Sequence, residues 1–420
     1  MLTRAPKGTK DVLPGESYKW QYIEKIMRDV CARFAYREIR TPTFEHTELF
    51  LRGIGDTTDV VQKEMYTFLD KKERSITLKP EGTAGVVRSF VESSMGGAAQ
   101  PTKMYYLNCP VFRYENPQHG RYREHHQFGI EGFGSEKPSI DAEVISLALT
   151  VLRELGVSGL ALNINSIGCK QCRPDYNKAL IEYLSKNKDG LCRDCQQRMG
   201  TNPLRVLDCK QETCSAIVKN APKMIDYLCG ECSTHFDGLK ARLKSADIDY
   251  VVNPMIVRGL DYYTKTVFEI ISTDIGALGT VCGGGRYDEL VEELGGKPTP
   301  GIGFGMGMER LLLVLESLGI DIPEPSLCDV YVCTLGENAS EKGFKITADL
   351  RAAGIKAECD HTGRSMKAQM KYAGKIGAGK VIIIGENEIA KGVAAVRDMK
   401  ASEEKTVAFE QLNEFIKGGE

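Results

Sequence analysis

The 420-residue sequence has no run of the ~18 consecutive apolar residues that a membrane-spanning helix needs. Its opening, MLTRAPKGTKDVLPGE, lacks the apolar core of a secretory signal. It also lacks an excess of either charge, because 55 basic residues face 57 acidic ones and leave a net charge of −2. We therefore expect a cytoplasmic protein without a membrane partner, and composition alone does not indicate nucleic-acid binding.

Two common nucleotide-binding loops are absent as well. No Gly-x-x-x-x-Gly-Lys-[Ser/Thr] occurs in the sequence. Residues 301–307 depart from Gly-x-Gly-x-x-Gly because Met306 occupies the third glycine position. Neither a P-loop nor a dinucleotide-binding Rossmann site is supported.

The length indicates several domains, because single hydrophobic cores stop growing near ~250–300 residues. Helical and extended segments mix in residues 1–167 and 251–320, which favours one α+β domain with antiparallel hairpins. A cysteine-rich insertion, 168–250, interrupts this domain. Two prolines mark 321–327 as a linker, and 328–420 then alternates strand-like and helical runs as a small α/β domain does.

Two extended segments, 104–115 and 121–133, predict a β-hairpin. Because side chains alternate along a strand, one face of the second segment carries Arg121, Arg123, His125, Gln127 and Glu131. A solvated outer face is the alternative interpretation of this pattern. His125 and His126 point to opposite faces, and we assign neither a catalytic role.

A second strand is stripped of side chains on one face, since glycine recurs with period two at Gly301, Gly303, Gly305 and Gly307. A flat group such as a nucleotide base can lie against bare backbone of this kind. Arg310 follows near the start of a predicted helix, where an anionic group is favoured. Tight packing and a surface ion pair are the alternative explanation.

Several ordered segments together resemble the motifs of class II aminoacyl-tRNA synthetases. Residues 37–42 (REIRTP) are similar to motif 1, 111–133 to motif 2 and 301–310 (GIGFGMGMER) to motif 3. Residues 257–264 (VRGLDYYT) and 283–288 (GGGRYD) resemble segments specific to bacterial-type histidyl-tRNA synthetases. LKPEGT at 78–83 and PKGTKD at 6–11 accompany them, so the resemblance covers essentially the whole chain.

This resemblance implies both a fold and a reaction. The fold is α+β: a catalytic domain on a six-stranded antiparallel sheet, the cysteine-rich insertion, and a small α/β anticodon-binding domain. The reaction activates L-histidine with ATP and Mg²⁺ to histidyl-adenylate and pyrophosphate, and then transfers histidine to the 3′ end of its transfer RNA. Motif 1 implies a homodimer.

The resemblance also implies how the phosphates are held. Arg113 holds the α-phosphate, and Arg258 lies between that phosphate and the histidine carboxylate, so both act in catalysis. Arg121 and Arg310 correspond to residues at the terminal phosphates, and Glu115 to one at the adenine amino group. Guanidinium forks suit phosphate oxygens by geometry and permanent charge.

Histidine selection requires groups that read a ring with one N–H donor and one nitrogen acceptor. By the resemblance, Glu131 and Tyr263 read the ring, and Tyr262 forms a wall of the pocket. The complete histidine-binding set that the resemblance implies is Glu81, Gly82, Thr83, Gln127, Glu131, Arg258, Tyr262 and Tyr263. Ordinary strand packing is the alternative for the two tyrosines taken alone.

A basic stripe in the last domain is a candidate for transfer-RNA binding. Spacings of three, four and four place Arg364, Lys367, Lys371 and Lys375 on one helix face, with no acidic residue between 364 and 380. A solvated lysine face is the alternative. By the resemblance, Gln118 and His119 of the motif 2 loop face the acceptor stem.

Eight of the 14 cysteines fall in four pairs within the insertion. They are Cys169 and Cys172, Cys192 and Cys195, Cys209 and Cys214, and Cys229 and Cys232. In a reducing cytoplasm such spacing indicates metal ligands rather than disulfides, and two Cys₄ zinc sites are possible. Buried free thiols are the alternative, because many histidyl enzymes do not require zinc at this place.

Two further interpretations compete with the synthetase. A regulatory paralogue typically lacks the anticodon domain and parts of the substrate motifs, whereas both are intact in this sequence. A zinc-dependent nucleic-acid-binding protein has no need of Arg113, Arg258 and Arg310 together with histidine-reading groups. The sequence therefore favours the enzyme.

Overall fold

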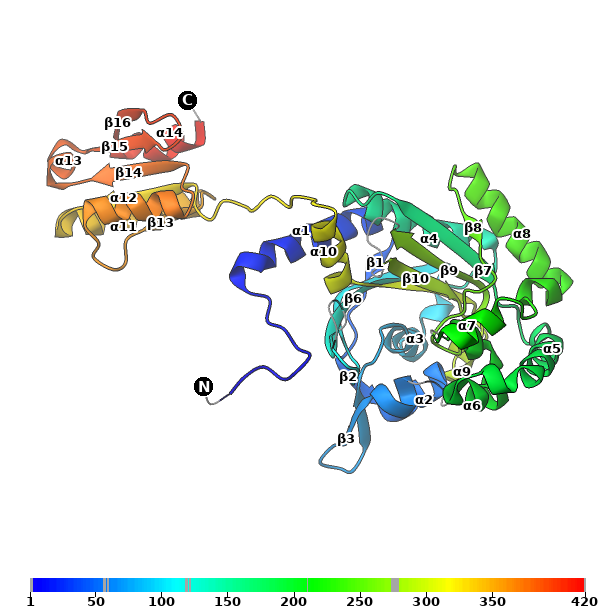
Figure 1. The fold of residues 1–420 in the computed structure, drawn as a ribbon. Coiled ribbons are helices and arrows are strands. Elements are labelled where there is room, and N and C mark those ends of the chain that lie inside the picture. The colour runs from blue at the N-terminus through cyan, green and yellow to red at the C-terminus, as the bar shows by residue number, and fades with distance from the viewer. Residues whose placement is uncertain are drawn as a thin grey trace. The chain divides into compact units, whose positions relative to one another are not determined.

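The computed structural model describes residues 3–55, 58, 60–117, 120, 122–209, 211–272 and 279–418. The chain forms two compact units, Met1–Ile322 and Pro323–Glu420. The division falls inside the proline-bearing segment 321–327. Figure 1 shows the helices and strands of both units.

An eight-stranded sheet forms the centre of the first unit, in the order β1-β5-β6-β11-β10-β9-β7-β8. The strands are β1 (Arg37–Glu38), β5 (Thr102–Phe112), β6 (Glu124–Phe133), β7 (Leu160–Ser166), β8 (Val251–Val252), β9 (Thr264–Ser272), β10 (Thr280–Arg286) and β11 (Gly301–Gly307). The six strands from β5 to β7 are antiparallel, as the resemblance implies. The sequence did not predict the short β1 and β8, which pair in parallel at the two edges.

Helices cover one face of this sheet. They are α1 (Pro14–Arg33), α4 (Pro138–Glu154), α8 (Gly230–Ser245) and α10 (Met308–Ser317). Their apolar side chains share one core with Phe128 and Ile130 of β6 and with Phe304 of β11. Because strand side chains alternate, Gln127, Gly129 and Glu131 of β6 face the opposite side.

Smaller elements surround that opposite face. They are α2 (Thr47–Ile54), the π-helical turn η1 (Val60–Glu64), α3 (Thr83–Glu92), η2 (Met95–Gly97), α9 (Leu290–Glu293) and a sheet of β2 (Phe44–His46), β4 (Ser75–Leu78) and β3 (Tyr66–Leu69). Val86, Val87 and Phe90 of α3 pack with Tyr262, Tyr263 and Tyr287 in a second core. This face of the sheet is therefore lined by aromatic rings rather than covered by long helices.

The insertion is built from short helices. They are α5 (Arg173–Lys186), η3 (Lys188–Gly190), α6 (Arg193–Thr201), η4 (Pro203–Asp208), α7 (Glu212–Val218) and η5 (Met224–Tyr227). They share a small core of their own in which the eight paired cysteines take part. The final helix, α8, differs, because Phe236, Leu239 and Leu243 pack into the catalytic core. The last part of 168–250 thus anchors the insertion to the sheet.

The second unit is a five-stranded mixed sheet with helices, in the strand order β13-β12-β14-β15-β16. Its elements are β12 (Val330–Thr334), α11 (Glu337–Ala352), β13 (Ala357–Cys359), α12 (Met366–Lys375), β14 (Lys380–Ile384), α13 (Glu386–Lys391), β15 (Val393–Asp398), β16 (Glu404–Ala408), η7 (Phe409–Gln411) and α14 (Leu412–Gly418). The alternation of strands and helices predicted for 328–420 is present.

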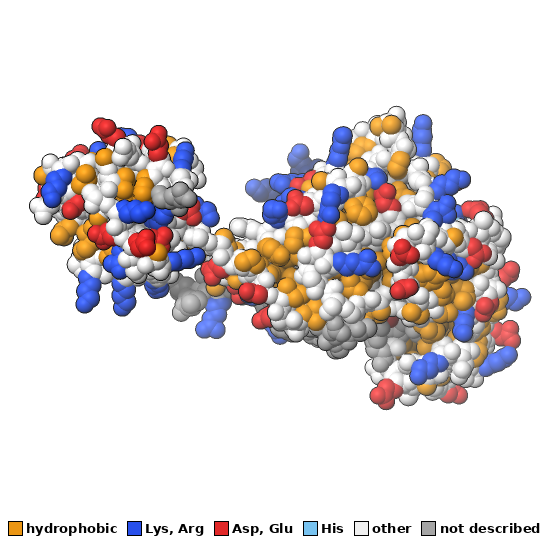
Figure 2. All heavy atoms as spheres, turned by 90° about the horizontal axis from the view of Figure 1, so that it is seen from above, with side chains coloured by type: hydrophobic (Ala, Val, Ile, Leu, Met, Phe, Trp, Pro, Cys, Tyr) orange, Lys and Arg blue, Asp and Glu red, His pale blue; other side chains and the backbone are white. Residues whose placement is uncertain are grey.

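The surface carries both signs of charge. Figure 2 shows basic and acidic side chains interspersed over one face of each unit, as a net charge of −2 implies. Several Lys and Arg side chains project along one edge of the smaller unit in this view. Among the helices in the described part of the chain, none combines the length and apolar character needed to cross a membrane.

A buried charge network joins the sheet to its helices. Asp141 of α4 accepts hydrogen bonds from the guanidinium of Arg286, at the end of β10, and lies 2.8 Å from Nε2 of His235 on α8. The side chains of Asp141 and Arg286 are fully buried. Burial alone raises the pKa of Asp141, but the charge of Arg286 and the hydrogen bonds bring it down to about 2. Asp141 is therefore ionised and paired in the folded protein.

We predict that Asp141→Asn destabilises the first unit by roughly 3 kcal/mol at neutral pH, because the fully buried Arg286 then keeps only Asp288, 3.0 Å from Nη1, as a counter-ion. Urea unfolding followed by fluorescence of the single tryptophan, Trp20 of α1, measures this change. The folded pKa of Asp141 lies below the ordinary 3.8. The ionised Asp141 therefore makes its full contribution to the free energy of unfolding above pH 3.8, and this contribution is lost as the pH falls toward about 2.

Asp237→Asn is the matched control. Asp237 is 65% exposed and forms an ion pair with Lys240 on the surface of α8. Its removal should change the free energy of unfolding by less than ~1 kcal/mol. Equal urea midpoints for Asp141→Asn and this control at neutral pH would show that the buried pair does not stabilise the unit.

Candidate active site

An open cavity of about 210 Å³ lies over the sheet face opposite the long helices. Residues that the sequence assigned to ATP and histidine meet at its wall: Arg113, Glu115, Gln127, Arg258 and Arg310. They come from the end of β5, from β6, from the loop before β9 and from α10. Segments far apart in the chain thus place three guanidinium groups around one space.

The backbone fixes two of these arginines. Nε of Arg113 donates to the carbonyl oxygen of Pro80 at 2.9 Å, and Nη1 of Arg310 donates to the carbonyl of Thr280 at 3.0 Å. Arg258 is held differently, because Nη1 donates to the carboxylate of Glu269 at 2.5 Å. Its Nε is buried and has no hydrogen-bond partner among the described residues. This guanidinium therefore has unused capacity for an anionic ligand.

Glycines admit these side chains to the sheet face. A Cβ on Gly283 would lie 2.7 Å from the guanidinium nitrogens of Arg258, which therefore rest on bare backbone. A Cβ on Gly303 would lie 2.0 Å from the carboxylate of Glu131, and one on Gly301 2.3 Å from the ring of Tyr287. At Gly301 and Gly303 the bared strand face is therefore filled by Tyr287 and Glu131, which is the tight packing named as the alternative. Only Gly305 and Gly307 of the period-two stretch line the open cavity.

A buried carboxylate lies beside this cavity, on the same strand as Gln127. Glu131 is fully buried, and it accepts hydrogen bonds from Thr83 Oγ1 at 2.7 Å and from the Tyr287 hydroxyl. Burial raises the pKa of Glu131 to about 8, although the two hydrogen bonds act to lower it. Sequence reasoning missed Tyr287, whose signal was its place in GGGRYD.

Glu81 and Thr83 mark the beginning of α3. The carboxylate of Glu81 accepts the backbone N–H groups of Thr83 at 2.7 Å and of Ala84 at 2.6 Å. Burial raises the pKa of Glu81, and these hydrogen bonds oppose the shift. Gly82 lets the ring of Tyr106 approach, since a Cβ there would lie 2.5 Å from it.

The tyrosine pair completes this buried group. The ring centroids of Tyr262 and Tyr263 are 4.7 Å apart, and Tyr262 makes an edge contact with Tyr287 at 5.6 Å. The guanidinium of Arg258 lies 6.0 Å from the ring of Tyr263. The histidine-reading candidates are thus gathered in a closed cluster, apart from Gln127 and Arg258, which line the open cavity.

The two neighbouring histidines lie on opposite faces, as predicted. His125 lines the cavity, and burial, followed by the charge of Arg113, lowers its pKa to about 4. His126 turns toward the helices, where Nδ1 lies 2.8 Å from the carboxylate of Glu309 and the ring contacts Trp20. Three predicted residues of the motif 2 loop, Gln118, His119 and Arg121, lie outside the described residues.

The basic stripe is less uniform than its spacing suggests. Lys367, Lys371 and Lys375 are exposed along α12. Arg364 precedes the helix, where it pairs with Asp360 at 2.7 Å and lies 4.4 Å from the ring of Tyr372. The sequence missed this pairing because Asp360 lies before the stretch free of acidic residues.

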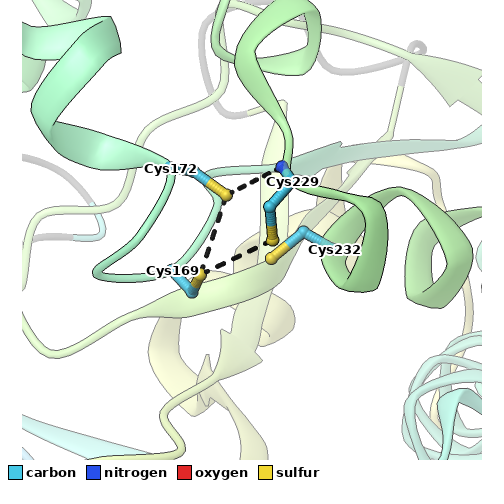
Figure 3. Close-up of side chains that lie close together, drawn as sticks. All are labelled: Cys169, Cys172, Cys229 and Cys232. Carbon is cyan, nitrogen blue, oxygen red and sulfur yellow. Dashed lines mark hydrogen bonds between the residues drawn. The ribbon is translucent and has the colours of Figure 1, made fainter.

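The cysteine pairs assemble into two groups of four. Cys169 and Cys172 meet Cys229 and Cys232, whereas the remaining four, Cys192, Cys195, Cys209 and Cys214, form the second group. In each group all sulfur atoms lie within 4.8 Å of one another. Figure 3 shows the first group, with its four side chains converging from two separate segments.

Comparison with known proteins agrees with this arrangement. The histidyl-tRNA synthetase family model matches residues 8–311, and the anticodon-binding domain model matches 329–418. A histidine–tRNA ligase of Acetivibrio thermocellus is 56% identical over 99% of this chain and 100% of its own length. One from Caldanaerobacter subterraneus has the same identity and coverage.

A solved structure is similar over the same extent. The apo histidyl-tRNA synthetase of S. aureus superimposes with a TM-score of 0.85 at 40% identity, covering 99% of this chain and 100% of its own. The ordered motifs, the antiparallel sheet with its arginine-lined cavity and full-length similarity all agree. The chain belongs to the histidyl-tRNA synthetase family.

Proposed function

We propose that this chain is the ligase that joins L-histidine to its transfer RNA, in two steps at the arginine-lined cavity. The observation that supports this best is the convergence of Arg113, Arg258 and Arg310 on one cavity beside the buried Glu131. Three permanent cations suit a substrate with several phosphates, and a buried carboxylate suits a ring N–H.

In the first step, the histidine carboxylate attacks the α-phosphorus of ATP. A bond forms between a carboxylate oxygen and phosphorus, the bond to the β-phosphate oxygen breaks, and pyrophosphate leaves. Arg113 and Arg258 hold the two anions together and neutralise the developing charge. Arg310 and Arg121 bind the outer phosphates, whose charge the Mg²⁺ carried by ATP also offsets, and Glu115 accepts the adenine amino group.

Histidine is read by the buried cluster. Glu131, which is protonated at neutral pH in the free protein, accepts the ring N–H through its carbonyl oxygen, and the hydroxyl of Tyr263 reaches the other ring nitrogen, with Tyr262 as a wall. Glu81, Thr83 and Gln127 surround the α-amino end, and Gly82 leaves room for Tyr106 beside them. A side chain without both ring nitrogens leaves buried polar groups unpaired, which disfavours its binding.

In the second step, a ribose hydroxyl of the terminal adenosine of transfer RNA attacks the carbonyl carbon of the adenylate, and AMP leaves. Gln118 and His119 contact the acceptor end. The smaller unit binds the anticodon region, with Lys367, Lys371, Lys375 and Arg364 at its phosphates. The enzyme works as a homodimer through motif 1, in the cytoplasm.

Each cysteine group binds one zinc ion. A Zn–S bond of ~2.3 Å in a tetrahedral site places neighbouring sulfurs ~3.8 Å apart. The sulfur of Cys169 lies 3.7 Å from that of Cys172 and 3.9 Å from that of Cys229. The backbone N–H of Cys229 donates to the sulfur of Cys172, and that of Cys192 to the sulfur of Cys214. Such N–H donors stabilise the thiolate that a metal requires.

Arg258→Ala should lower histidine-dependent pyrophosphate exchange at least about 100-fold, or ~2.7 kcal/mol of barrier, because carboxylate and phosphate then repel each other. The exchange rate is measured at saturating ATP. Arg153→Ala, on the exposed surface of α4, is the control and should exchange normally. A folded Arg258→Ala protein within about threefold of wild type would remove this residue from the mechanism.

The titration of Glu131 gives a pH-dependent prediction. The folded protein keeps this proton up to about pH 8, whereas the unfolded chain releases it near 4.5. Raising the pH between these values therefore favours unfolding. Glu131→Gln has no such titration, so its free energy of unfolding should rise relative to that of wild type across this range.

Urea unfolding at several pH values measures this difference, with the exposed Glu136→Gln as control. The control should keep a constant offset from wild type. A constant offset for Glu131→Gln as well would mean that Glu131 is ionised at neutral pH in the free protein.

Metal analysis tests the cysteine groups. Protein purified without chelator should contain two zinc ions per chain, one for each group. Cys232→Ser and Cys195→Ser should each lower the zinc content by one, whereas Cys31→Ala, a buried cysteine outside both groups, should not change it. Zinc-free wild-type protein whose unfolding is unaffected by strong chelator would leave only buried thiols.

Truncation tests the division of labour between the units. A chain ending at Ile322 keeps the whole cavity and should still exchange pyrophosphate at a rate near that of full-length protein. Charging of transfer RNA should fall and become less salt-dependent, because the phosphate contacts of α12 are lost. Both assays use one preparation whose dimeric state has been checked. Undiminished charging would refute the role of the smaller unit.

A further inference from the structure

We propose that the two cysteine groups, through bound metal, position the loop 257–263, so that histidine affinity depends on metal in the insertion. This inference rests on the proposed function. Arg173, Asn202 and Arg205 act as positioning residues that connect the insertion to the loop. None of the three belongs to the set that contacts histidine or ATP.

The loop needs outside support. Residues 257–263 carry Arg258, Tyr262 and Tyr263 but belong to no helix or strand. On the catalytic side, the Asp261 N–H donates to the carbonyl of Ile54 at 3.3 Å. The side chain of Asn165 holds the carbonyl of Ile256 at 3.0 Å, just before the loop. Four further polar contacts to this loop's backbone and to Asp261 come from the insertion.

The first cysteine group supports the end of the loop. Cys172 is the N-cap of α5, and the next residue, Arg173, donates from its guanidinium to the carbonyl of Tyr263. Glu231, between Cys229 and Cys232, pairs with Nζ of Lys265 at 2.8 Å. Arg173 and Glu231, which make these two contacts, are each one residue away from a cysteine of the first group. A shift of this group therefore moves Tyr263 directly.

The second cysteine group supports the middle of the loop. Asn202 and Arg205 lie between Cys195 and Cys209, at the junction of α6 and η4. The amide of Asn202 donates to Oδ1 of Asp261 at 2.8 Å, and the guanidinium of Arg205 donates to the carbonyl of Gly259. The contacted residues, Gly259 and Asp261, lie on either side of Leu260, and Gly259 comes directly after Arg258. The second group thus helps to fix the backbone that follows Arg258, whose guanidinium is also held by Glu269.

The insertion holds the loop mainly by these directional bonds. A cavity of about 220 Å³ separates much of the loop from the insertion, and Arg173, Asn202 and Arg205 line it together with Arg258 and Tyr263. Among loop residues, only Val257 at the beginning packs into the insertion core. Polar bridges across a cavity transmit position only while both of their ends are fixed.

Bound metal fixes the ends of these polar contacts that lie in the insertion. The small insertion core includes all eight paired cysteines, so a large part of its interior is thiol rather than hydrocarbon. Without a cation, the four sulfurs within 4.8 Å of one another are protonated, and the metal–sulfur bonds that tie the separate segments together are lost. Metal loss therefore loosens α5 and the segment of Asn202 and Arg205, and the loop loses its support.

Of the arginines assigned to ATP phosphates, Arg113 and Arg310 do not share this dependence, whereas Arg258, which meets both the α-phosphate and the histidine carboxylate, does. Arg113 and Arg310 are fixed by carbonyls of Pro80 and Thr280, which belong to the catalytic sheet and its neighbouring segments. Loosening the insertion should therefore raise the KM for histidine, which three residues of the loop contact, much more than the KM for ATP, which only Arg258 of the loop contacts. General unfolding of the active site would raise both.

The first arm of the test uses full-length protein with normal zinc. Arg173→Ala and Arg205→Ala should each raise the KM for histidine about tenfold, keep the KM for ATP within about twofold and retain both zinc ions. Arg173→Lys, which still reaches a carbonyl, should recover part of the loss. The exposed Arg193→Ala, one residue after Cys192, is the matched control and should behave as wild type.

The second arm removes the metal. Histidine binding measured by calorimetry should weaken at least about tenfold after zinc is chelated from wild type, and return when zinc is restored. Equal histidine affinity with and without zinc, or unchanged histidine KM in both arginine variants, would overturn the inference. Absence of histidine-dependent exchange in wild type would instead overturn the proposed function, so the two failures are distinguishable.

Discussion

The buried pair of Asp141 and Arg286 determines how the rest of the first unit is arranged. Arg286 ends β10, and its guanidinium reaches Asp141 of α4, which also meets His235 of α8. The next residue, Tyr287, is turned by this anchoring toward the other face of the sheet, where its hydroxyl reaches Glu131. One ion pair therefore joins the helical layer, the cysteine-rich insertion and the buried carboxylate of Glu131.

Much of this arrangement could be predicted, because the signals are local or periodic. Alternation along β6 separates His125 from His126, and the two prolines near 323–325 mark the division between the units. Motif similarity identifies Arg113, Arg258 and Arg310, which the structure gathers at one cavity. None of these inferences needs knowledge of which distant residues touch.

What could not be predicted depends on pairings across the chain. Period-two glycine in β11 indicates a bare strand face, but the register with β6 and β10 decides what fills it. Glu131 faces Gly303 across that register, and Tyr287 follows β10 beside Gly301. Likewise, four cysteine pairs allow several groupings. Only the return of the chain at α8 brings Cys229 and Cys232 to Cys169 and Cys172.

The two substrates are thus held by supports of different stiffness. Arg113 and Arg310, the proposed phosphate ligands, are tied to the backbone around a continuous antiparallel sheet, where each strand is fixed by two neighbours. Arg258 and Tyr263 stand on a loop that packs against the catalytic domain but also takes directional contacts from an insertion with a small, thiol-rich core. Because each directional bond contributes only about 1 kcal/mol, a modest change in the insertion shifts the loop without disturbing the sheet. Under the proposed assignments, amino-acid recognition is the adjustable half of this site, and nucleotide binding is the rigid half.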